Sequence, residues 1–181
     1  MLLETKISRR GFLQTAGALT FSFTFAGRVT NAVAQGAAAK FNTWVSIGTD
    51  GTVTVMMPAA EMGQGSLTAL SLILAEELDA DWSKVRPEAP AYDPQLGSQG
   101  TGGSGSVLDT HSRLRVAGAT MRQMLVAAAA QQLGVPASEL TTRDSRVIHA
   151  ASNRSVGYGA LADAASKVAV PTNVRLRRSL S

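Results

Sequence analysis

Two segments of this chain carry their apolar residues at the spacing of an α-helix. The first should begin with Ser66 as its N-cap and stop near Ala80, and one face holds Leu67, Leu70, Leu74 and Leu78. The second should run from about Asp109 to Leu133, and its inward face holds Leu114, Ala117, Met121, Leu125 and Ala128. A helix with one apolar stripe must bury it against another layer, so these two segments locate the core of the fold.

The ends and middle of these helices carry further signals. Glu76, Glu77 and Asp79 crowd the C-terminal end of the first helix, where carboxylates oppose the helix dipole. The small run Ala117-Gly118-Ala119 should let the second helix approach a neighbour closely, and Gly134 suits the position just beyond its end.

Short β-prone segments surround the two helices. Strands are expected at 41–47 and 52–56, joined by a hairpin at Asp50-Gly51, and a short third strand should begin at Val85. A second hairpin should turn at Asp144-Ser145, and a short helix should run from Tyr158 to about Ser166. The pattern predicts an α+β fold in which β-hairpins form a small mixed sheet packed against two long helices.

The N-terminus reads as an export signal. Ser8-Arg9-Arg10-Gly11-Phe12-Leu13 fits the twin-arginine pattern, and a weakly apolar run follows from Ala16 to Ala26. Ala32 and Ala34 supply an A-x-A site, so cleavage is expected after Ala34. The alternative is a retained amphipathic or membrane-anchoring helix. Residues 1–34 therefore predict a periplasmic protein exported by the twin-arginine machinery. The twin-arginine route is associated with folded proteins that often carry a cofactor.

Composition limits what the rest of the chain can do. The 147 residues after Ala34 suffice for one domain, and they hold 13 basic and 12 acidic residues, which gives no reason to expect nucleic-acid binding. The sequence contains no cysteine, so it cannot ligate an iron–sulfur cluster through thiolates. Its two histidines, His111 and His149, are far apart in sequence and make a metal site improbable. The basic residues at 175, 177 and 178 are expected to form a frayed end.

Two glycine-rich loops, at 61–66 and 100–106, each lead into a predicted helix. Glycine lets a ligand approach the backbone, and the N–H groups at a helix N-terminus favour anions. One such loop alone is usually a plain connector. Phosphate-loop, dinucleotide-fold and nucleophile-elbow motifs do not fit the sequence. An acid/base pair of Glu61 and Glu76 is disfavoured, because Glu76 is expected to face solvent.

The first loop, Glu61-Met62-Gly63-Gln64-Gly65, resembles the E-M-G-Q-G motif of the xanthine dehydrogenase and aldehyde oxidase family. The resemblance is greatest to the molybdopterin-binding large subunit of isoquinoline 1-oxidoreductase-like enzymes. It extends over residues 41–171, through the second glycine-rich loop, Ala117-Gly118-Ala119 and Tyr158-Gly159-Ala160-Leu161. The fold it implies is part of the second molybdopterin-binding domain of a molybdenum hydroxylase.

The resemblance also implies a cofactor and the residues that contact it. The cofactor is molybdopterin in its cytosine dinucleotide form, and molybdenum is bound mainly by this cofactor rather than by protein side chains. The binding residues carried over from the family are Met62, Gly63, Gln64, Gly65, Gly102, Gly103, Ser104, Gly105 and Ser106. Val107 departs from a hydroxyl residue found there in some relatives, so one side-chain bond is lost.

The sequence lacks other parts of the family pattern. No G-x-G-E segment with the family's catalytic glutamate is present, so no catalytic residue is assigned. The resemblance implies the N-terminal part of an oxidoreductase acting on aldehydes or N-heterocycles, inactive alone. It would need the remaining molybdenum-subunit domains, or a second chain, and a separate iron–sulfur subunit.

The expected organisation is a leader at 1–34, a linker at 35–40, a partial molybdopterin-binding domain at 41–171 and a divergent basic tail at 172–181. A naturally split subunit and a truncated gene product both fit this organisation. A non-catalytic molybdopterin-binding or assembly module and a non-functional fragment remain the alternative functions.

Overall fold

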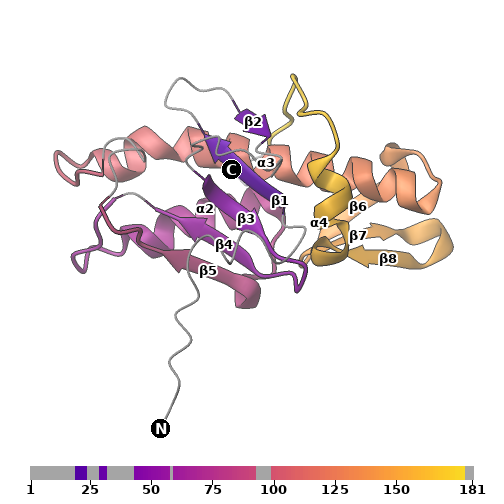
Figure 1. Ribbon diagram of the computed structural model, residues 1–181, viewed down its shortest axis with the longest axis horizontal. Helices are drawn as coiled ribbons and strands as arrows, with labels where there is room; N and C mark the ends of the chain where they lie inside the picture. Colours follow the sequence, from indigo (N-terminus) through magenta and orange to yellow (C-terminus); the bar gives the residue numbers. More distant parts are fainter. Residues whose placement is uncertain (1–18, 24–28, 32–42, 58, 93–98, 178–181) are drawn as a thin grey trace, which may run out of the picture.

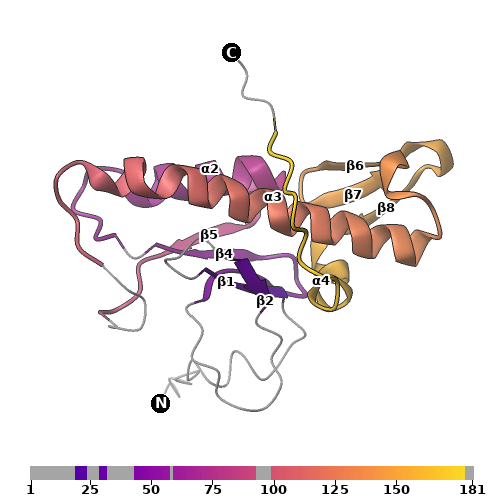
Figure 2. The same ribbon diagram turned by 90° about the horizontal axis from the view of Figure 1, so that it is seen from above.

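The computed structural model describes residues 19–23, 29–31, 43–57, 59–92 and 99–177. Within them, one face of a five-stranded sheet packs on two long helices, and a three-stranded sheet with a short helix lies at one end (Figures 1 and 2). This arrangement confirms the predicted α+β class, with two sheets in place of the single one expected. In the described part of the chain, no helix is long and apolar enough to cross a membrane.

The larger sheet is mixed, as predicted. Strand β3 (Thr43–Ile47) pairs antiparallel with β4 (Val53–Met56), and Val45 lies opposite Val55. Strand β5 (Val85–Glu88) runs parallel to β4, because helix α2 carries the chain back across the sheet between them. Pro87 lies within β5, which is tolerated because β5 is at the edge of the sheet.

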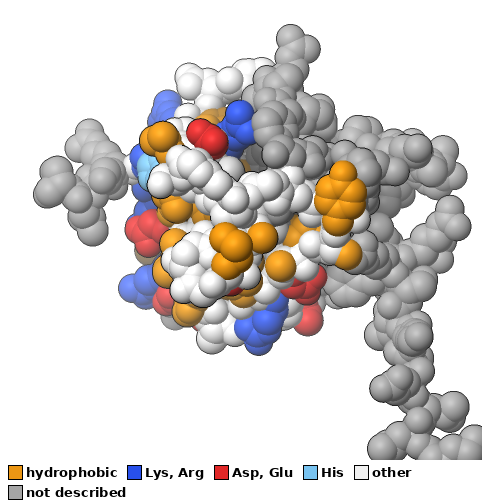
Figure 3. Space-filling model, turned by 90° about the vertical axis from the view of Figure 1, so that its left-hand side faces the viewer, with side chains coloured by type: hydrophobic (Ala, Val, Ile, Leu, Met, Phe, Trp, Pro, Cys, Tyr) orange, Lys and Arg blue, Asp and Glu red, His pale blue; other side chains and the backbone are white. Residues whose placement is uncertain are grey.

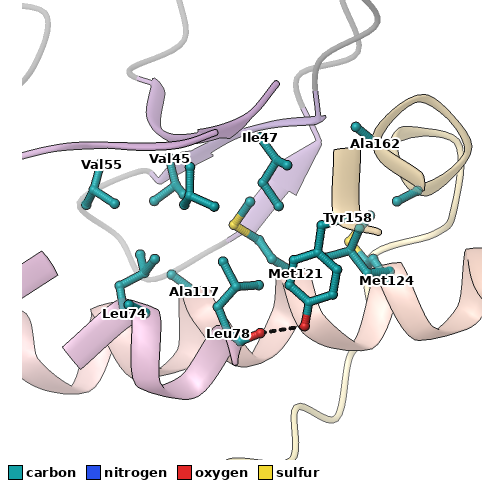
Figure 4. Close-up of a cluster of buried hydrophobic side chains, with 14 of the residues drawn as sticks. Val45, Ile47, Val55, Leu74, Leu78, Ala117, Met121, Met124, Tyr158 and Ala162 are labelled. Atoms are coloured by element: carbon teal, nitrogen blue, oxygen red, sulfur yellow. Dashed lines mark hydrogen bonds between the residues drawn. The ribbon is translucent and has the colours of Figure 1, made fainter. Parts of the chain in front are cut away.

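Both predicted helices form, with different N-terminal ends. Helix α2 (Ser66–Leu78) buries Leu70, Leu74 and Leu78, and helix α3 (Gly105–Leu133) buries every residue predicted for its inward face. Figure 4 shows Leu74 and Leu78 beside Ala117 and Met121 under the sheet residues Val45 and Val55. Helix α3 begins four residues earlier than expected, so the end of the second glycine-rich loop is its first turn.

The close contact between α2 and α3 depends on Gly118. A Cβ atom built on Gly118 would lie 2.5 Å from the carbonyl oxygen of Leu74 and 2.9 Å from Cβ of Glu77. Real Cβ atoms essentially never come so near a backbone atom. The predicted close approach at Ala117-Gly118-Ala119 is therefore confirmed.

The smaller sheet contains β6 (Leu140–Arg143), β7 (Arg146–His149) and β8 (Arg154–Gly157), of which β8 was not predicted. Asp144 and Ser145 both have positive φ, as a two-residue hairpin turn requires. Short 3₁₀ turns lie at Trp82–Lys84, Ala137–Glu139 and Ala150–Ser152.

Helix α4 (Tyr158–Ser166) ties the smaller sheet to the core. The buried Tyr158 hydroxyl donates to the carbonyl oxygen of Leu78 at 2.7 Å, and this bond is visible in Figure 4. Burial raises the pKa of Tyr158, so the phenol stays neutral and remains a donor.

The described part of the basic tail, which ends at Arg177, is docked rather than frayed, and this corrects the sequence expectation for Arg175 and Arg177. Arg122 and Gln123 of α3 donate to the carbonyl oxygen of Arg175, and Arg115 donates to that of Arg177. Arg177 pairs with Asp79, and its backbone N–H donates to Glu77 Oε2 at 2.9 Å. Of the three carboxylates expected to destabilise the end of α2, Glu77 and Asp79 are therefore paired with cations from α3 and the tail, whereas Glu76 is exposed.

Two strands lie inside the predicted leader. Strand β1 (Leu19–Phe23) pairs antiparallel with both β2 (Val29–Asn31) and β3, so the order of the larger sheet is β2-β1-β3-β4-β5. This part of the apolar run is a strand rather than the helix considered as an alternative. The twin arginines, Ala32, Ala34 and the linker at 35–40 lie outside the described residues.

Candidate functional site

The two glycine-rich loops lie side by side at one end of the molecule. The backbone N–H of Ala60 donates to the Thr101 hydroxyl at 2.7 Å, and that hydroxyl donates back to the Ala60 carbonyl oxygen at 3.3 Å. The loops are 41 residues apart in sequence at this bridge. Thr101 therefore holds together two segments that the sequence indicated only separately.

A cavity of about 310 Å³ opens between the loops, and its walls come from both of them. It is lined by Gln64, Gly65, Ser66, Ala69, Thr101, Gly102, Ser104, Ser106 and Val107. Five of the nine predicted binding residues belong to this wall. Its volume is at the small end of the range for ligand sites.

The other four predicted residues lie outside the cavity wall. Met62 projects into solvent with 71 % of its surface exposed, and Gly63 is exposed beside it. Gly103 turns the backbone into α3, and Gly105 is the first residue of that helix. The structure therefore places these four residues around the cavity rather than in it.

Glu61 organises the first loop, a role that sequence reasoning missed. One carboxylate oxygen accepts from the backbone N–H groups of Gly63 at 2.8 Å and Gly65 at 2.9 Å. The other accepts from the N–H of Leu67 at 2.9 Å and the Ser66 hydroxyl at 3.3 Å. These bonds lower the pKa of Glu61, chiefly through the N–H groups of Leu67 and Gly65.

Glu61 therefore caps helix α2, and Ser66 is not the N-cap. The N-cap is Gly65, whose φ of 76° lies in the left-handed region that glycine adopts at little cost. A carboxylate at a helix N-terminus is favoured by the helix dipole. The sequence feature that could have indicated this cap is a glutamate six residues before the first leucine of the helix. Glu76 is exposed near the other end of α2, so the two glutamates form no acid/base pair.

Gln64 is also engaged within its own loop. Its side-chain nitrogen donates to the Ala60 carbonyl oxygen and the Ser66 hydroxyl, both at 2.8 Å. Its side-chain oxygen accepts from the Met62 N–H at 2.6 Å. Both amide hydrogens are used, so only one acceptor site of the amide oxygen is left for a ligand.

Helix α3 presents a different N-terminus to the cavity. Its N-cap residue, Ser104, has a φ of 58° and forms no side-chain cap. Ser104 and Ser106 line the cavity, and their hydroxyls form no hydrogen bond with the described residues. The first N–H groups of an α-helix have no partner within the helix, and that of Gly105 donates to the Gly102 carbonyl oxygen at 3.1 Å. The anion-favouring end is thus at α3, whereas that of α2 is already taken by Glu61.

Exposed hydrophobic side chains surround this site. Met62, Val107 and Leu108 expose 71, 43 and 82 % of their surfaces. Figure 3 looks at this end of the molecule and shows hydrophobic side chains among uncharged groups.

Lowering the pH should weaken the first loop through Glu61. A carboxylate whose pKa is depressed by folding contributes stability above its unfolded pKa and loses it as the pH falls through the folded pKa. We expect Glu61→Gln to lower the melting temperature at pH 7, and the difference from wild type to vanish in acid. Melting curves from pH 7 to pH 3 measure this. Glu76→Gln, at an exposed glutamate near the other end of α2, is the control, and an equal effect there would contradict the role given to Glu61.

The chain belongs to the family of molybdopterin cofactor-binding domains, whose model matches residues 6–179. It is 40 % identical over 169 residues to the beta subunit of isoquinoline 1-oxidoreductase from Brevundimonas diminuta, covering 86 % of this chain and 22 % of the relative. It is 37 % identical over 164 residues to the membrane-bound aldehyde dehydrogenase [pyrroloquinoline-quinone] of Gluconacetobacter polyoxogenes. This match covers 86 % of this chain and 21 % of the relative. The chain thus spans about a fifth of the length of these curated relatives.

Solved structures agree with this family. Quinoline 2-oxidoreductase from Pseudomonas putida 86 is 26 % identical with a TM-score of 0.51, and the Cu,Mo-CO dehydrogenase is 25 % identical with a TM-score of 0.56. Each match covers 66 % of this chain and 15 % of the solved chain. The resemblance to molybdenum hydroxylases seen in the sequence is therefore confirmed.

Proposed function

We propose that this chain binds molybdopterin through the cavity between its two glycine-rich loops, as the N-terminal part of an exported molybdenum hydroxylase. The observation that carries the proposal is the cavity wall itself, where residues of both loops meet beside the N-terminus of α3, which has no side-chain cap. Membership of the family supports the choice of cofactor.

The residues present fit such a group. The N–H groups of α3 and the hydroxyls of Ser104 and Ser106 suit phosphate oxygens or ring nitrogens. Gln64 can add one acceptor from its amide oxygen, while Glu61 keeps the first loop in shape. A dinucleotide form of the cofactor carries a pyrophosphate, and the helix N-terminus favours its charge. The choice of the cytosine dinucleotide form rests on the family resemblance alone.

The bound cofactor would supply the molybdenum chemistry that hydroxylates an aldehyde or N-heterocycle with oxygen from water. The residues of this chain bind and orient it, and they exclude water on one side. None of them is assigned a catalytic role, and we propose no turnover by this chain alone. Electrons would leave through a separate iron–sulfur subunit, because this sequence has no cysteine. The remaining molybdenum-subunit domains, or a second chain, would cover the exposed side chains.

The leader supports a periplasmic location through the twin-arginine route. We propose export of the folded, cofactor-loaded protein and cleavage after Ala34. The mass of the protein recovered from the periplasm tests this. Loss of residues 1–34 is expected, and an intact N-terminus would contradict cleavage. Replacing Arg9 and Arg10 with lysine should leave the protein in the cytoplasm.

Filling the cavity should abolish cofactor binding without unfolding the protein. Gly102 lines the cavity, and a Cβ built on it meets no atom within 4 Å. Gly102→Leu should therefore remove most of the pterin that copurifies with the full-length chain, measured by the fluorescence of the oxidised extract. Gly157→Leu is the matched control, because Gly157 has the same free space and lies at the start of α4. Equal pterin in both variants would contradict the site.

A further inference from the structure

Strand β1 covers the outer edge of β3, although it belongs to the predicted leader. Leu19 lies opposite Ile47, Thr20 opposite Ser46 and Phe21 opposite Val45. The register then shifts, which brings Ser22 opposite Thr43. The pairing therefore follows β3 along its length, and β2 in turn covers the far side of β1.

Without β1, the buried strand β3 would have an unpaired outer edge. Val45 and Ile47 are 1 and 0 % exposed, so β3 is a core strand of the domain. Its inner edge pairs with β4, whereas its outer edge pairs only with β1 among the described strands. An edge without a partner presents a row of free N–H and C=O groups that other chains can pair with.

We propose that the export leader is a removable edge strand: before cleavage, Leu19–Phe23 occupies the outer edge of β3, and cleavage after Ala34 opens that edge. The opening step rests on the proposed export, whereas the pairing does not. In the precursor the leader completes the sheet of a protein that folds before export.

A disulfide tests the pairing, since the wild-type chain has no cysteine. Thr20 and Ser46 are Cα partners, so cysteines at both positions lie within bridging distance and point to the same face. The test uses full-length protein kept in the cytoplasm by lysine at positions 9 and 10, then purified and mildly oxidised. We expect Thr20→Cys with Ser46→Cys to form the bridge almost completely, as read by a non-reducing gel and by mass.

The control places one cysteine on the other face of β1. Leu19→Cys with Ser46→Cys has similar sequence separation, but successive side chains of a strand point to opposite faces. This pair should bridge poorly. Equal bridging by the two pairs would overturn the proposal, because a leader without fixed pairing would sample both contacts alike. Neither result depends on pterin binding or on export.

Hydrogen exchange tests the opening step. The purified precursor and the exported, cleaved chain are compared over residues 43–47, with β4 as the internal reference because it is paired on both sides. We expect the cleaved chain to lose protection at 43–47 and to regain it when a synthetic peptide of residues 17–32 is added. Equal protection in both forms would overturn the opening step. An exported protein of uncleaved mass would instead show that the proposed cleavage after Ala34 had failed.

Discussion

Replacing Gly118 with alanine should lower the free energy of unfolding by about 2 kcal/mol, which is within the usual cost of overpacking a core. The new methyl group would lie 2.5 Å from the Leu74 carbonyl oxygen, so α2 and α3 must move apart along their contact. Alanine favours a helix over glycine by about 1 kcal/mol, and this gain only partly offsets the clash.

Urea unfolding followed by circular dichroism measures the effect of Gly118→Ala. Gly157→Ala is the matched control, since a Cβ there meets no atom within 4 Å. It should change stability by no more than a few tenths of a kcal/mol on either side of zero. A stabilised Gly118→Ala protein would contradict the packing of the two helices described above.

Replacing Glu77 with alanine should cost about 3 kcal/mol, as expected when one partner of a buried ion pair is removed. The Glu77 carboxylate is 2 % exposed, and it accepts from Arg115 Nε at 2.6 Å and from the N–H of Arg177. Its loss leaves Arg115 and Arg122 without their shared anion. Because Arg115 is about a quarter exposed and can regain water, the lower end of the usual range is expected.

The same substitution should release the tail. The tail is held at Arg175 and Arg177 by Glu77, Asp79 and three side chains of α3, so limited proteolysis should cut the tail sooner in Glu77→Ala. Glu76→Ala, the exposed neighbour, is the control for both measurements. Equal stability and equal cleavage in the two variants would show that Glu77 holds neither the helices nor the tail.

Periodicity predicted the two long helices because the buried face of a helix appears in the sequence as apolar residues at helical spacing. The leucines of α2 and the small residues around Gly118 carried that information directly. The docked tail left no such pattern, because it is held through its own carbonyl groups, one backbone N–H and the Arg177–Asp79 ion pair, whose partners are far away in the chain. Strand β1 was missed for a related reason, since the same apolar run also fits an export signal.

The candidate site was predictable only in part. The family motif identified both loops, and five of its residues line one cavity. The different roles of the two loops could not be predicted from the sequence, because they depend on the position of the Glu61 carboxylate at the N-terminus of α2. That carboxylate occupies the α2 terminus, so the α3 terminus alone is left for an anion.

Titration of the ¹⁵N-labelled full-length chain with molybdopterin tests the central claim most directly. The backbone N–H signals of Gly65, Gly102 and Gly103 should shift together, because these residues lie in the two loops that form the site. The signals of Gly134 and Gly157, at the far ends of α3 and β8, should stay in place. No shift at any glycine, or shifts confined to Gly134 and Gly157, would contradict a molybdopterin site between the loops.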